Sequence, residues 1–540
     1  MAPVRMSGGG QPWWRRAVFY ELYLRSFQDS DGDGIGDLPG VLRRVDYLAE
    51  LGVDAVWVTP FYPSPMADFG YDVADHCGVD PTYGALADVD RLLEALDRRG
   101  MRLVLDYVPN HTSVEHPWFR EARASRSAER RDWYLWREPA PDGGPPNNWL
   151  SQAGGSAWTF DERTGQYYLH SFLPEQPDLN WRNPAVREAM LQVLRFWLDR
   201  GVHGFRVDVL GALLKDADFR DDPPNPRYQP GDPDFMRLLP IRSANQPEIL
   251  EIVAAMRAVL ARYPGERVLI GELYDPVETL VSYYGPALGG VQLPFNMNLL
   301  WLRWCAQGVL DLVNRYEAGL PGGAWPTWVL GNHDQPRVAS RLGPGQARVA
   351  AMLLLTLRGA PTLYQGDELG LRNAEIPPHR VRDRFTGPGR CRDQQRSPML
   401  WDDGPGAGFT AGEPWLPVEP RAGASVRAQQ EDPGSMLSLT RALLALRRRE
   451  AALVDGDWRG ISAADNVLIY ERCNAERRIR VALNMDETPK EGGFAGEGAW
   501  RVALSTDPAR DKGWIDGVFT LAGDEGVVLR PENRTGGGPR

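Results

Sequence analysis

The chain has 540 residues, which is too long for one ordinary domain or for a bare α/β barrel of about 250 residues. With 43% hydrophobic and 25% charged residues it has the composition of a folded protein, which excludes a disordered chain and a collagen. A formal net charge of −11 argues against a nucleic-acid partner, because phosphate binding needs clustered Lys and Arg.

The sequence also argues against a cysteine-bound metal and against membrane insertion. The four cysteines, Cys77, Cys305, Cys391 and Cys473, lie far apart and form no CxxC pair, so we expect reduced thiols. The amino-terminal residues hold no apolar signal segment, and an uncharged run of about 18 apolar residues does not occur. These features predict a soluble cytoplasmic protein with no membrane partner, and they leave the oligomeric state open.

Short β-rich runs alternate with helical patterns along most of the chain. Their apolar residues follow one another almost without interruption, as is typical of parallel strands buried on both faces. The predicted strands are 17–23, 54–60, 102–108, 204–209, 267–273, 291–296, 326–332 and 360–366. Eight strands with intervening helices predict an α/β fold of the (β/α)8 TIM barrel type.

Two helices carry clear sequence signals. One begins at Asn183-Pro184, where an N-cap residue precedes a proline, and ends before Gly201. Its apolar residues recur at helical spacing, so they would cover one face of the sheet. The other is an amphipathic helix at 435–450, and we expect it to be the last helix of the barrel domain.

Two stretches do not fit the alternation and are predicted to be separate units. Residues 112–183 are rich in Trp, Tyr, Pro and Gly and are too long for a plain loop, so we expect an inserted subdomain after the third strand that lines the substrate cleft. Short alternating strands predict a C-terminal antiparallel β-sandwich over 453–540. The barrel would then comprise residues 11–111 and 184–450.

Four acidic residues fall at the carboxyl ends of predicted strands. Asp106, Asp208 and Glu272 end the third, fourth and fifth strands, and Asp334 follows the seventh. The carboxyl ends of barrel strands converge on the face where barrel enzymes hold their active sites. Two carboxyl groups there can cleave a glycosidic bond if one attacks the anomeric carbon and the other protonates the leaving oxygen.

These two roles require opposite protonation states. The acid must hold a proton near neutral pH, and the apolar neighbours of Glu272 permit this because burial raises the pKa of a carboxyl group. The nucleophile must stay ionised. Arg206 lies two residues before Asp208 on the same strand, so the two side chains point to the same side and can pair.

Four segments resemble the signature segments of the α-amylase superfamily, glycoside hydrolase family 13. They are DYVPNH, GFRVDVL, GELY and NHDQPR, and they occur in the order of that family. The resemblance covers nearly the whole chain and is strongest toward bacterial α-glucosidases and oligo-1,6-glucosidases. The fold that it implies agrees with the barrel, insertion and sandwich predicted above.

The resemblance also implies a role for each matching residue. Asp208 would be the nucleophile, Glu272 the general acid and base, and Asp334 the ligand of the 2- and 3-hydroxyls of the glucosyl ring. The implied substrate contacts are Asp68, Tyr71, His111, Arg206, His333 and Arg396. Among these, Tyr71 would be the stacking platform, and the two histidines would donate hydrogen bonds to ring hydroxyls. Asp68 and Arg396 would close the pocket around one sugar, which implies exo action.

The implied enzyme is a retaining exo-α-glucosidase that needs no organic cofactor. It would release α-D-glucose from small isomaltose-, maltose-, sucrose- or trehalose-type substrates through a β-glucosyl-Asp intermediate. Val209 follows the nucleophile, where relatives that prefer α-1,6 linkages tend to carry Val, so we expect α-1,6 activity over strict α-1,4 activity. A barrel strand favours a β-branched residue there in any case.

Two other functions fit parts of this pattern. A glucosyl-transferring or isomerising enzyme, such as a trehalose synthase or sucrose isomerase, uses the same acids but lets a sugar reach the intermediate before water. A non-catalytic binding subunit would lack the catalytic residues and carry a membrane helix. This sequence has the full set of acids and no such helix, which disfavours the second alternative.

A further motif predicts a structural metal site. The segment DSDGDGIGD at 29–37 has acidic residues at alternate positions, with a glycine where a calcium-binding loop turns sharply. The predicted ligands are Asp29, Asp31, Asp33, the Ile35 carbonyl and Asp37. Relatives bind Ca²⁺ or Mg²⁺ at this loop, away from catalysis. The alternative is an acidic solvated turn without a metal.

Overall fold

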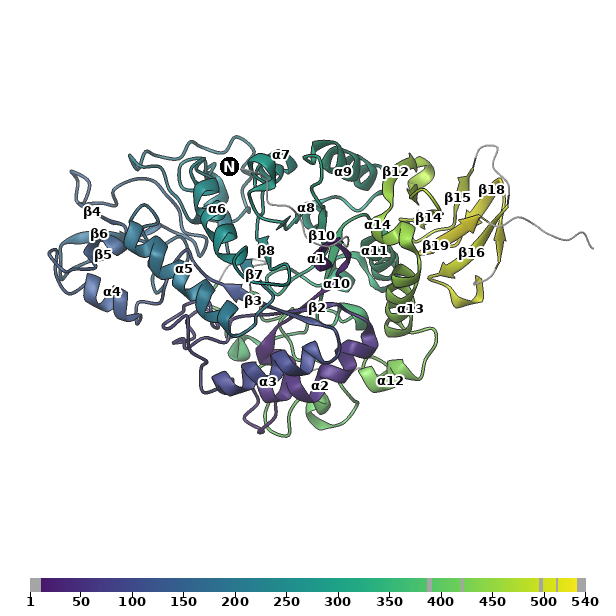
Figure 1. Cartoon of the computed structure of the whole chain (residues 1–540), viewed down its shortest axis with the longest axis horizontal. Coiled ribbons are helices and arrows are strands. Elements are labelled where there is room, and N and C mark those ends of the chain that lie inside the picture. Colours follow the sequence, from purple (N-terminus) through teal and green to yellow (C-terminus); the bar gives the residue numbers. More distant parts are fainter. Residues whose placement is uncertain (1–10, 386–390, 419–421, 495–498, 511–512, 532–540) are drawn as a thin grey trace, which may run out of the picture.

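The computed structural model describes residues 11–385, 391–418, 422–494, 499–510 and 513–531. An inserted subdomain and a C-terminal β-domain lie at opposite ends of the long axis of the molecule, on either side of a central barrel (Figure 1). The part of the predicted C-terminal domain beyond Pro531 lies outside the described residues.

The barrel consists of eight parallel strands in the order β10-β11-β1-β2-β3-β7-β8-β9. Every strand falls inside one of the predicted ranges, which confirms the predicted barrel. The strands are β1 (Phe19–Leu22), β2 (Ala55–Val58), β3 (Arg102–Tyr107), β7 (Gly204–Val207), β8 (Val268–Gly271), β9 (Leu293–Pro294), β10 (Thr327–Val329) and β11 (Ala360–Tyr364). Their side chains are almost all buried, as expected for strands covered on both faces.

The two end strands of this sheet, β9 and β10, are joined through a side chain. The hydroxyl of Thr327 donates a hydrogen bond to the Pro294 carbonyl at 2.6 Å. The same oxygen accepts one from the Asn296 backbone N–H at 3.1 Å. Pro294 has no backbone N–H to offer a strand ladder, so the Thr327 hydroxyl bridges the edges and brings the sheet round into a barrel.

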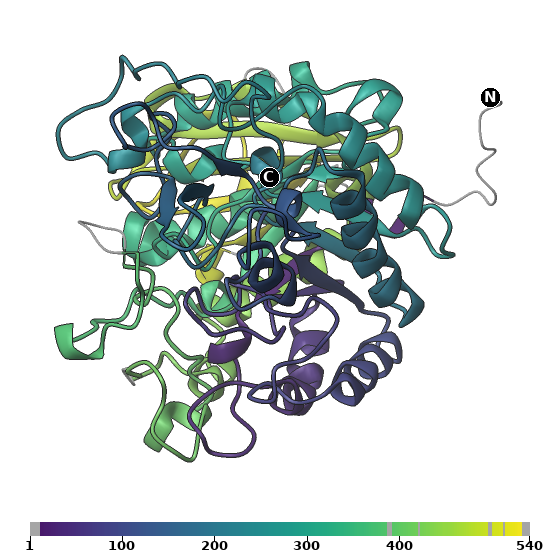
Figure 2. The ribbon, with the colours of Figure 1, turned by 90° about the vertical axis from the view of Figure 1, so that its left-hand side faces the viewer.

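Helices cover the outside of the barrel (Figure 2). The predicted helix after Asn183 is α5, and the Asn183 side chain caps it by accepting from the Ala185 N–H at 2.8 Å. The helices of this region are α1 (Trp13–Arg16), α2 (Leu38–Leu51), α3 (Leu86–Asp97), α5 (Pro184–Asp199), α6 (Ile249–Leu260), α7 (Val277–Ser282), α8 (Asn298–Trp301), α9 (Ala306–Gly319), α10 (Val338–Leu342), α11 (Pro344–Thr356), α12 (Val426–Gln430), α13 (Met436–Arg449) and α14 (Ala451–Asp455). In the described part of the chain, none of the helices has the length and apolar composition that a membrane crossing requires.

The insertion after β3 is built on aromatic packing. It contains α4 (Pro117–Ala122), η2 (Arg131–Trp133) and a three-stranded antiparallel sheet in the order β4-β6-β5, with β4 at Trp136–Arg137, β5 at Trp158–Asp161 and β6 at Gln166–Leu169. Trp136, Trp149 and Trp158 are buried. Trp149 and Trp158 share a small buried cluster with Leu169, so part of the tryptophan signal that marked this region comes from its own core.

The C-terminal domain is a pair of antiparallel sheets packed on an apolar core, which fits the predicted β-sandwich. The larger sheet contains β12 (Asp457–Ser462), β13 (Val467–Cys473), β14 (Arg478–Asn484), β19 (Gly526–Pro531), β16 (Trp500–Ser505) and β17 (Trp514–Ile515). The smaller one pairs β15 (Lys490–Gly493) with β18 (Val518–Leu521). Ile469 and Val527 from the large sheet share one buried cluster with Phe519 and Leu521 from the small sheet.

Two long excursions of the barrel were not predicted. Residues 210–248 follow β7 and contain the short turns η3 (Leu210–Ala212) and η4 (Asp234–Arg237). Residues 366–425 follow β11 and contain η6 (Asp367–Leu369), η7 (Pro378–Arg380) and η8 (Pro405–Gly408) within their described part. Neither stretch has a regular hydrophobic period, so its sequence does not predict a helix or a strand.

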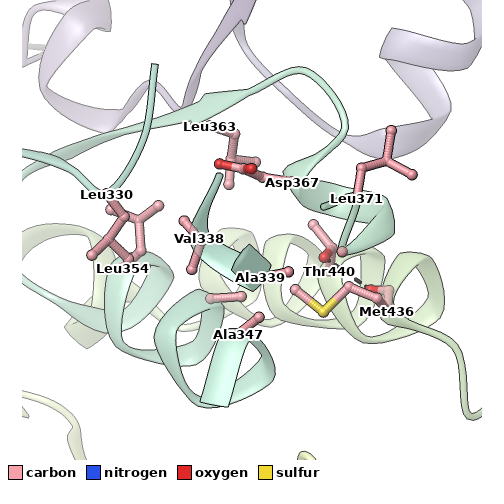
Figure 3. Close-up of a pocket in the computed structure, with 12 residues that line it drawn as sticks. Leu330, Val338, Ala339, Ala347, Leu354, Leu363, Asp367, Leu371, Met436 and Thr440 are labelled. Carbon is pink, nitrogen blue, oxygen red and sulfur yellow. Dashed lines mark hydrogen bonds between the residues drawn. The ribbon is translucent and has the colours of Figure 1, made fainter. Parts of the chain in front are cut away.

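A small cavity of about 20 Å³ lies beside the barrel, against α10, α11 and α13. Its wall is apolar except for Thr440 and Asp367, whose carboxyl group sits among leucine and valine side chains (Figure 3). The Asp367 Oδ1 atom has no hydrogen-bond partner among the described residues, and the Arg337 guanidinium is 4.0 Å away. Burial outweighs the attraction of Arg337 and raises the pKa of Asp367 from 3.8 to about 7.

This buried carboxyl should make the protein less stable as the pH rises. Above about pH 4 Asp367 is ionised in the unfolded chain, whereas the folded chain keeps the proton up to about pH 7, so the free energy of unfolding falls across this window. Between about pH 5 and about pH 8, we expect the free energy of unfolding to fall by about 3 kcal/mol less in the Asp367→Asn variant than in the wild type. Denaturant unfolding at both pH values measures it.

The exposed Glu129→Gln variant is the matched control for loss of one carboxylate. It should keep the pH dependence of the wild type. An Asp367→Asn variant with an unchanged pH dependence would contradict the shifted pKa.

Candidate active site

The centre of the candidate site is one buried guanidinium that binds three carboxyl groups. Arg206 of β7 contacts Asp106 Oδ1 at 2.7 Å, Asp208 Oδ1 at 2.6 Å and Glu272 Oε1 at 2.6 Å. Arg206 is about 1% exposed, and the side chains of Asp208 and Glu272 are 8% and 3% exposed. The arginine thus holds the two predicted catalytic carboxyls beside each other.

The strand order of the barrel explains this arrangement. β7 lies between β3 and β8, and Asp106 of β3 is the direct register partner of Arg206. Glu272 follows the last residue of β8, so its side chain comes from the neighbouring strand end on the other side. The guanidinium also lies 4.9 Å from the ring centroid of Trp57, on β2.

Crowding of acids in a buried place changes their ionisation. Burial and the repulsion of neighbouring carboxylates raise the pKa of Asp208 and that of Glu272, against the attraction of Arg206. Three carboxyl groups share one positive charge, so the group as a whole retains protons at a pH where exposed carboxyls have lost theirs.

The residue after the predicted nucleophile has a strained backbone. Val209 has φ 38° and ψ 48°, a left-handed conformation that β-branched residues rarely adopt. In this conformation its N–H donates a hydrogen bond to Glu272 Oε2 at 2.9 Å. Glu272 is therefore held at both oxygens, by Arg206 and by this N–H.

Asp334 is the most accessible of the predicted catalytic acids, with a side chain 25% exposed. Although burial alone would raise it, the pKa of Asp334 is lowered by His333, Arg396 and Arg392. Arg396 Nη2 contacts Asp334 Oδ1 at 2.6 Å, and Arg392 Nη1 lies 3.3 Å from the same atom. The lowered pKa favours the anionic form of Asp334, and part of its side chain is accessible to a ligand.

Among the predicted aromatic and histidine contacts, His333 lies against this anion, with its Nε2 3.3 Å from Asp334 Oδ2. The rings of Tyr71 and His333 are stacked at 5.4 Å and 7°, and Tyr71 Oη donates to Asp106 Oδ2 at 2.9 Å. Burial lowers the pKa of His111 to about 4, so that ring is neutral. His111 Nε2 lies 3.1 Å from the Tyr71 carbonyl.

A chain of contacts connects all nine predicted catalytic and substrate residues. Asp68 and Arg396, which the resemblance implies would close the pocket, have different partners. Asp68 Oδ1 contacts Arg392 Nη2 at 2.7 Å, while Arg396 binds Asp334 and donates from Nε to the His333 carbonyl at 3.0 Å. The two arginines are four residues apart, and both reach Asp334, while Arg392 also binds Asp68.

Sequence reasoning missed three residues that position the site. Besides Arg392, these are Glu21 of β1, whose Oε1 lies 2.6 Å from His333 Nδ1, and Gln176, whose Nε2 donates to Asp68 Oδ2 at 3.0 Å. Arg392 stands in the segment RDQQR that supplied Arg396 and could have been found there. Glu21 and Gln176 act through other side chains, and a linear motif carries no signal of that.

The predicted metal loop forms a separate group of acids. Carboxylate oxygens of Asp29, Asp31 and Asp37 lie within 4.8 Å of one another. Asp33 is not in that group, and its Oδ1 accepts from the Ile35 N–H at 2.7 Å. Backbone N–H groups also hold the inner two carboxylates, for example Gly34 to Asp29 and Gly40 to Asp37. Three converging carboxylates are a donor set that suits Ca²⁺ or Mg²⁺.

Residues 21–456 match the family described as the alpha amylase catalytic domain. A probable alpha-glucosidase of Rhizobium meliloti is 40% identical over 498 residues, which cover 88% of this chain and 90% of that protein. An oligo-1,6-glucosidase of Parageobacillus thermoglucosidasius is 37% identical over 523 residues, which cover 88% of this chain and 91% of that protein.

Solved structures agree with these matches. An alpha-glucosyl transfer enzyme is 41% identical with a TM-score of 0.91, covering 96% of this chain and 99% of its own. The trehalulose synthase of Pseudomonas mesoacidophila is 33% identical with a TM-score of 0.87, covering 96% of this chain and 100% of its own. The family match spans the barrel and the inserted subdomain, which confirms the resemblance seen in the signature segments. The chain therefore belongs to the α-amylase family of glycoside hydrolases.

Proposed function

We propose that this glycoside hydrolase is a retaining exo-α-glucosidase that acts on short α-glucosides. The observation that carries the proposal is that Arg206 binds Asp208 and Glu272 at once, each at 2.6 Å. A retaining mechanism needs two carboxyl groups at close spacing, one ionised and one protonated. The shared guanidinium provides the close spacing. Burial and the neighbouring carboxylates raise the pKa of Glu272, which favours its protonated form.

In the first step, Asp208 attacks the anomeric carbon of the bound glucosyl unit. The bond from that carbon to the glycosidic oxygen breaks, and Glu272 gives its proton to the departing oxygen. The attack neutralises Asp208 while the loss of its proton leaves Glu272 charged, so the net charge around Arg206 stays the same. Asp334, kept anionic by its arginines, would accept hydrogen bonds from the 2- and 3-hydroxyls.

In the second step, Glu272 acts as a base. It takes a proton from water as the water oxygen bonds to the anomeric carbon, and the bond to Asp208 breaks. Two inversions at the same carbon return the α-anomer of glucose. The Val209 N–H, fixed on Glu272 Oε2, would keep the carboxyl group in place while its proton leaves and returns.

The proposed exo specificity rests on the ion pairs of Arg392 with Asp68 and with Asp383. Arg392 bonds both Asp68 at 2.7 Å and Asp383 at 2.7 Å, which ties the long segment after β11 to the segment before Tyr71. A bridge of this kind blocks one end of a substrate groove, so only the terminal sugar of a chain could enter. We further propose α-1,6 over strict α-1,4 preference on the identity of Val209.

A second candidate function is transfer of the glucosyl unit to another sugar. The similarity to an alpha-glucosyl transfer enzyme, at 41% identity and a TM-score of 0.91, favours it as an accompanying activity. Both functions use the same first step and differ only in whether water or a hydroxyl group of a sugar attacks the intermediate. Free glucose as the main product supports the hydrolase.

The test is the reaction of isomaltose, maltose, sucrose and trehalose followed by NMR. We expect α-glucose to appear before mutarotation produces the β-anomer, with isomaltose the fastest substrate. Asp208→Asn should abolish turnover with the fold intact. Glu272→Gln should lose about 10²–10⁴-fold on isomaltose but much less on α-glucosyl fluoride, because fluoride leaves without a proton.

The exposed Glu162→Gln variant is the control, and it should react like the wild type. If β-glucose appears first, the retaining mechanism is wrong. Conversion of the disaccharides into other disaccharides with little free glucose would favour the transfer enzyme instead.

We also propose that the loop at 29–37 binds a structural Ca²⁺ or Mg²⁺. Asp29, Asp31 and Asp37 would supply carboxylate oxygens, and Asp33 and the Ile35 carbonyl would complete the set as predicted from the sequence. The cation would offset the repulsion among these acids. The loop contacts the segment after β11 where the Thr410 hydroxyl donates to Asp29, so the bound ion would stabilise that contact.

Removing the metal should lower the melting temperature. A ligand present at about 100 times its dissociation constant stabilises the folded state by about 2.7 kcal/mol. We therefore expect a chelator to lower the melting temperature by several degrees and added Ca²⁺ or Mg²⁺ to restore it. Asp31→Asn should abolish this response and Glu129→Gln should keep it. Equal melting temperatures of the wild type with and without chelator would contradict the metal site.

A further inference from the structure

A cavity of about 400 Å³ lies between the inserted subdomain and the segment at 213–219. We propose that it binds a small sugar that carries one anionic group, a phosphate or a carboxylate. Its wall includes Arg131, Asp132, Trp136, Arg137, Lys215 and Phe219. The residues proposed for the glucosyl pocket do not line it, so the inference does not depend on the proposed hydrolysis.

The wall has an excess of positive charge. Five cationic side chains line the cavity against two acidic ones, Asp132 and Asp216. Three of the cations, Arg126, Arg182 and Lys215, have carboxylate partners that do not line the cavity, and Asp216 is paired with Arg220. The charges that remain in the wall are those of Arg131, Arg137 and Asp132, which sum to one positive charge.

Arg137 is the side chain whose environment most clearly lacks an anion. It is half-buried on β4, and among the described residues it forms no ion pair. Its Nη1 donates to the Trp136 carbonyl at 2.8 Å, and burial lowers the pKa of its guanidinium. A desolvated guanidinium of this kind gains more from an incoming phosphate or carboxylate than an exposed one would.

The guanidinium is also held in position before any ligand arrives. Its central carbon lies 3.6 Å from the ring centroid of Phe219. That ring stacks on Trp149 at 5.4 Å, and the Phe219 carbonyl accepts from Asn147 Nδ2 at 2.9 Å. Stacking fixes the plane of the guanidinium, so less side-chain entropy is lost when a ligand binds.

The rest of the wall suits a sugar. Leu135, Leu179 and Leu214 provide apolar surface for the C–H groups of a ring, and the cavity volume lies in the range of small-molecule sites, about 300–1,000 Å³. A bare inorganic ion would leave most of this space empty. We therefore assign a sugar body and one anionic group to the same ligand.

A buried ion pair separates this cavity from the glucosyl pocket. Lys215 Nζ contacts Asp178 Oδ2 at 2.5 Å and donates to Asn110 Oδ1 at 2.9 Å. Asn110 in turn lies 3.2 Å from His111 Nδ1, on the side of the predicted substrate contacts. A ligand in the cavity and a glucosyl unit in the pocket would thus occupy different places and bind at the same time.

The test is calorimetric titration of the whole protein with glucose 6-phosphate, glucuronate, glucose and inorganic phosphate. Each anionic probe is titrated with and without excess glucose, which occupies the glucosyl pocket. We expect glucose 6-phosphate and glucuronate to bind, and each to bind more tightly than inorganic phosphate. Arg137→Gln should weaken them about tenfold, since it removes a charged hydrogen bond.

Two further variants make the charge argument specific. Asp132→Asn should tighten binding of glucose 6-phosphate about twofold, because it removes the unpaired acid from the wall. Arg163→Gln removes one exposed positive charge from the same subdomain and should leave binding unchanged. Arg137→Lys keeps the charge and should bind better than Arg137→Gln. A circular dichroism spectrum and a melting temperature like those of the wild type show that each variant is folded.

Several results would overturn the proposal. Equal affinities of Arg137→Gln and the wild type would show that the cavity is not the site, and loss of binding in excess glucose would place the probe in the glucosyl pocket. Absence of binding by both sugar anions would exclude the ligand class. Inorganic phosphate binding as tightly as glucose 6-phosphate would exclude the sugar body.

Discussion

The guanidinium of Arg206 has to balance three carboxyl groups in a place that excludes water, and the active site is arranged around this constraint. Its contacts fix Asp208 and Glu272 at one spacing, and the deficit of positive charge keeps protons among the acids. Burial of a charged group is costly unless it is paired, so Arg206 and its three acids depend on one another for stability. Catalysis in the proposed mechanism moves charge within this one group.

A second balance of charges holds Asp334 and Asp68. Arg396 and Arg392 both reach Asp334, and Arg392 continues to Asp68. The pKa of Asp334 is therefore lowered, whereas burial raises the pKa of Asp208, of Glu272 and of Asp68. Two arginines thus favour the ionised form of Asp334, whereas the three acids around Arg206 share a single cation.

The barrel and the main acids could be predicted from the sequence because both depend on local patterns. Continuous apolar runs mark buried parallel strands, and an acid that follows such a run lies on the catalytic face of a barrel. The pairing of Asp68 with Arg392, the support of His333 by Glu21 and the strained Val209 depend on segments far apart in sequence. Such contacts leave no periodic signal in the sequence. The excursions 210–248 and 366–425 were not predicted because they also lack a regular hydrophobic period.

The most direct test of the central role of Arg206 is a double-mutant cycle on stability. The free energy of unfolding is measured for the wild type, Arg206→Met, Asp106→Asn and the double variant. We expect Arg206→Met to cost about 3–5 kcal/mol alone, because it leaves buried carboxyls unpaired, and at least about 1 kcal/mol less when Asp106 is already neutral. Additive effects of the two substitutions would contradict the claim that one guanidinium balances the buried acids.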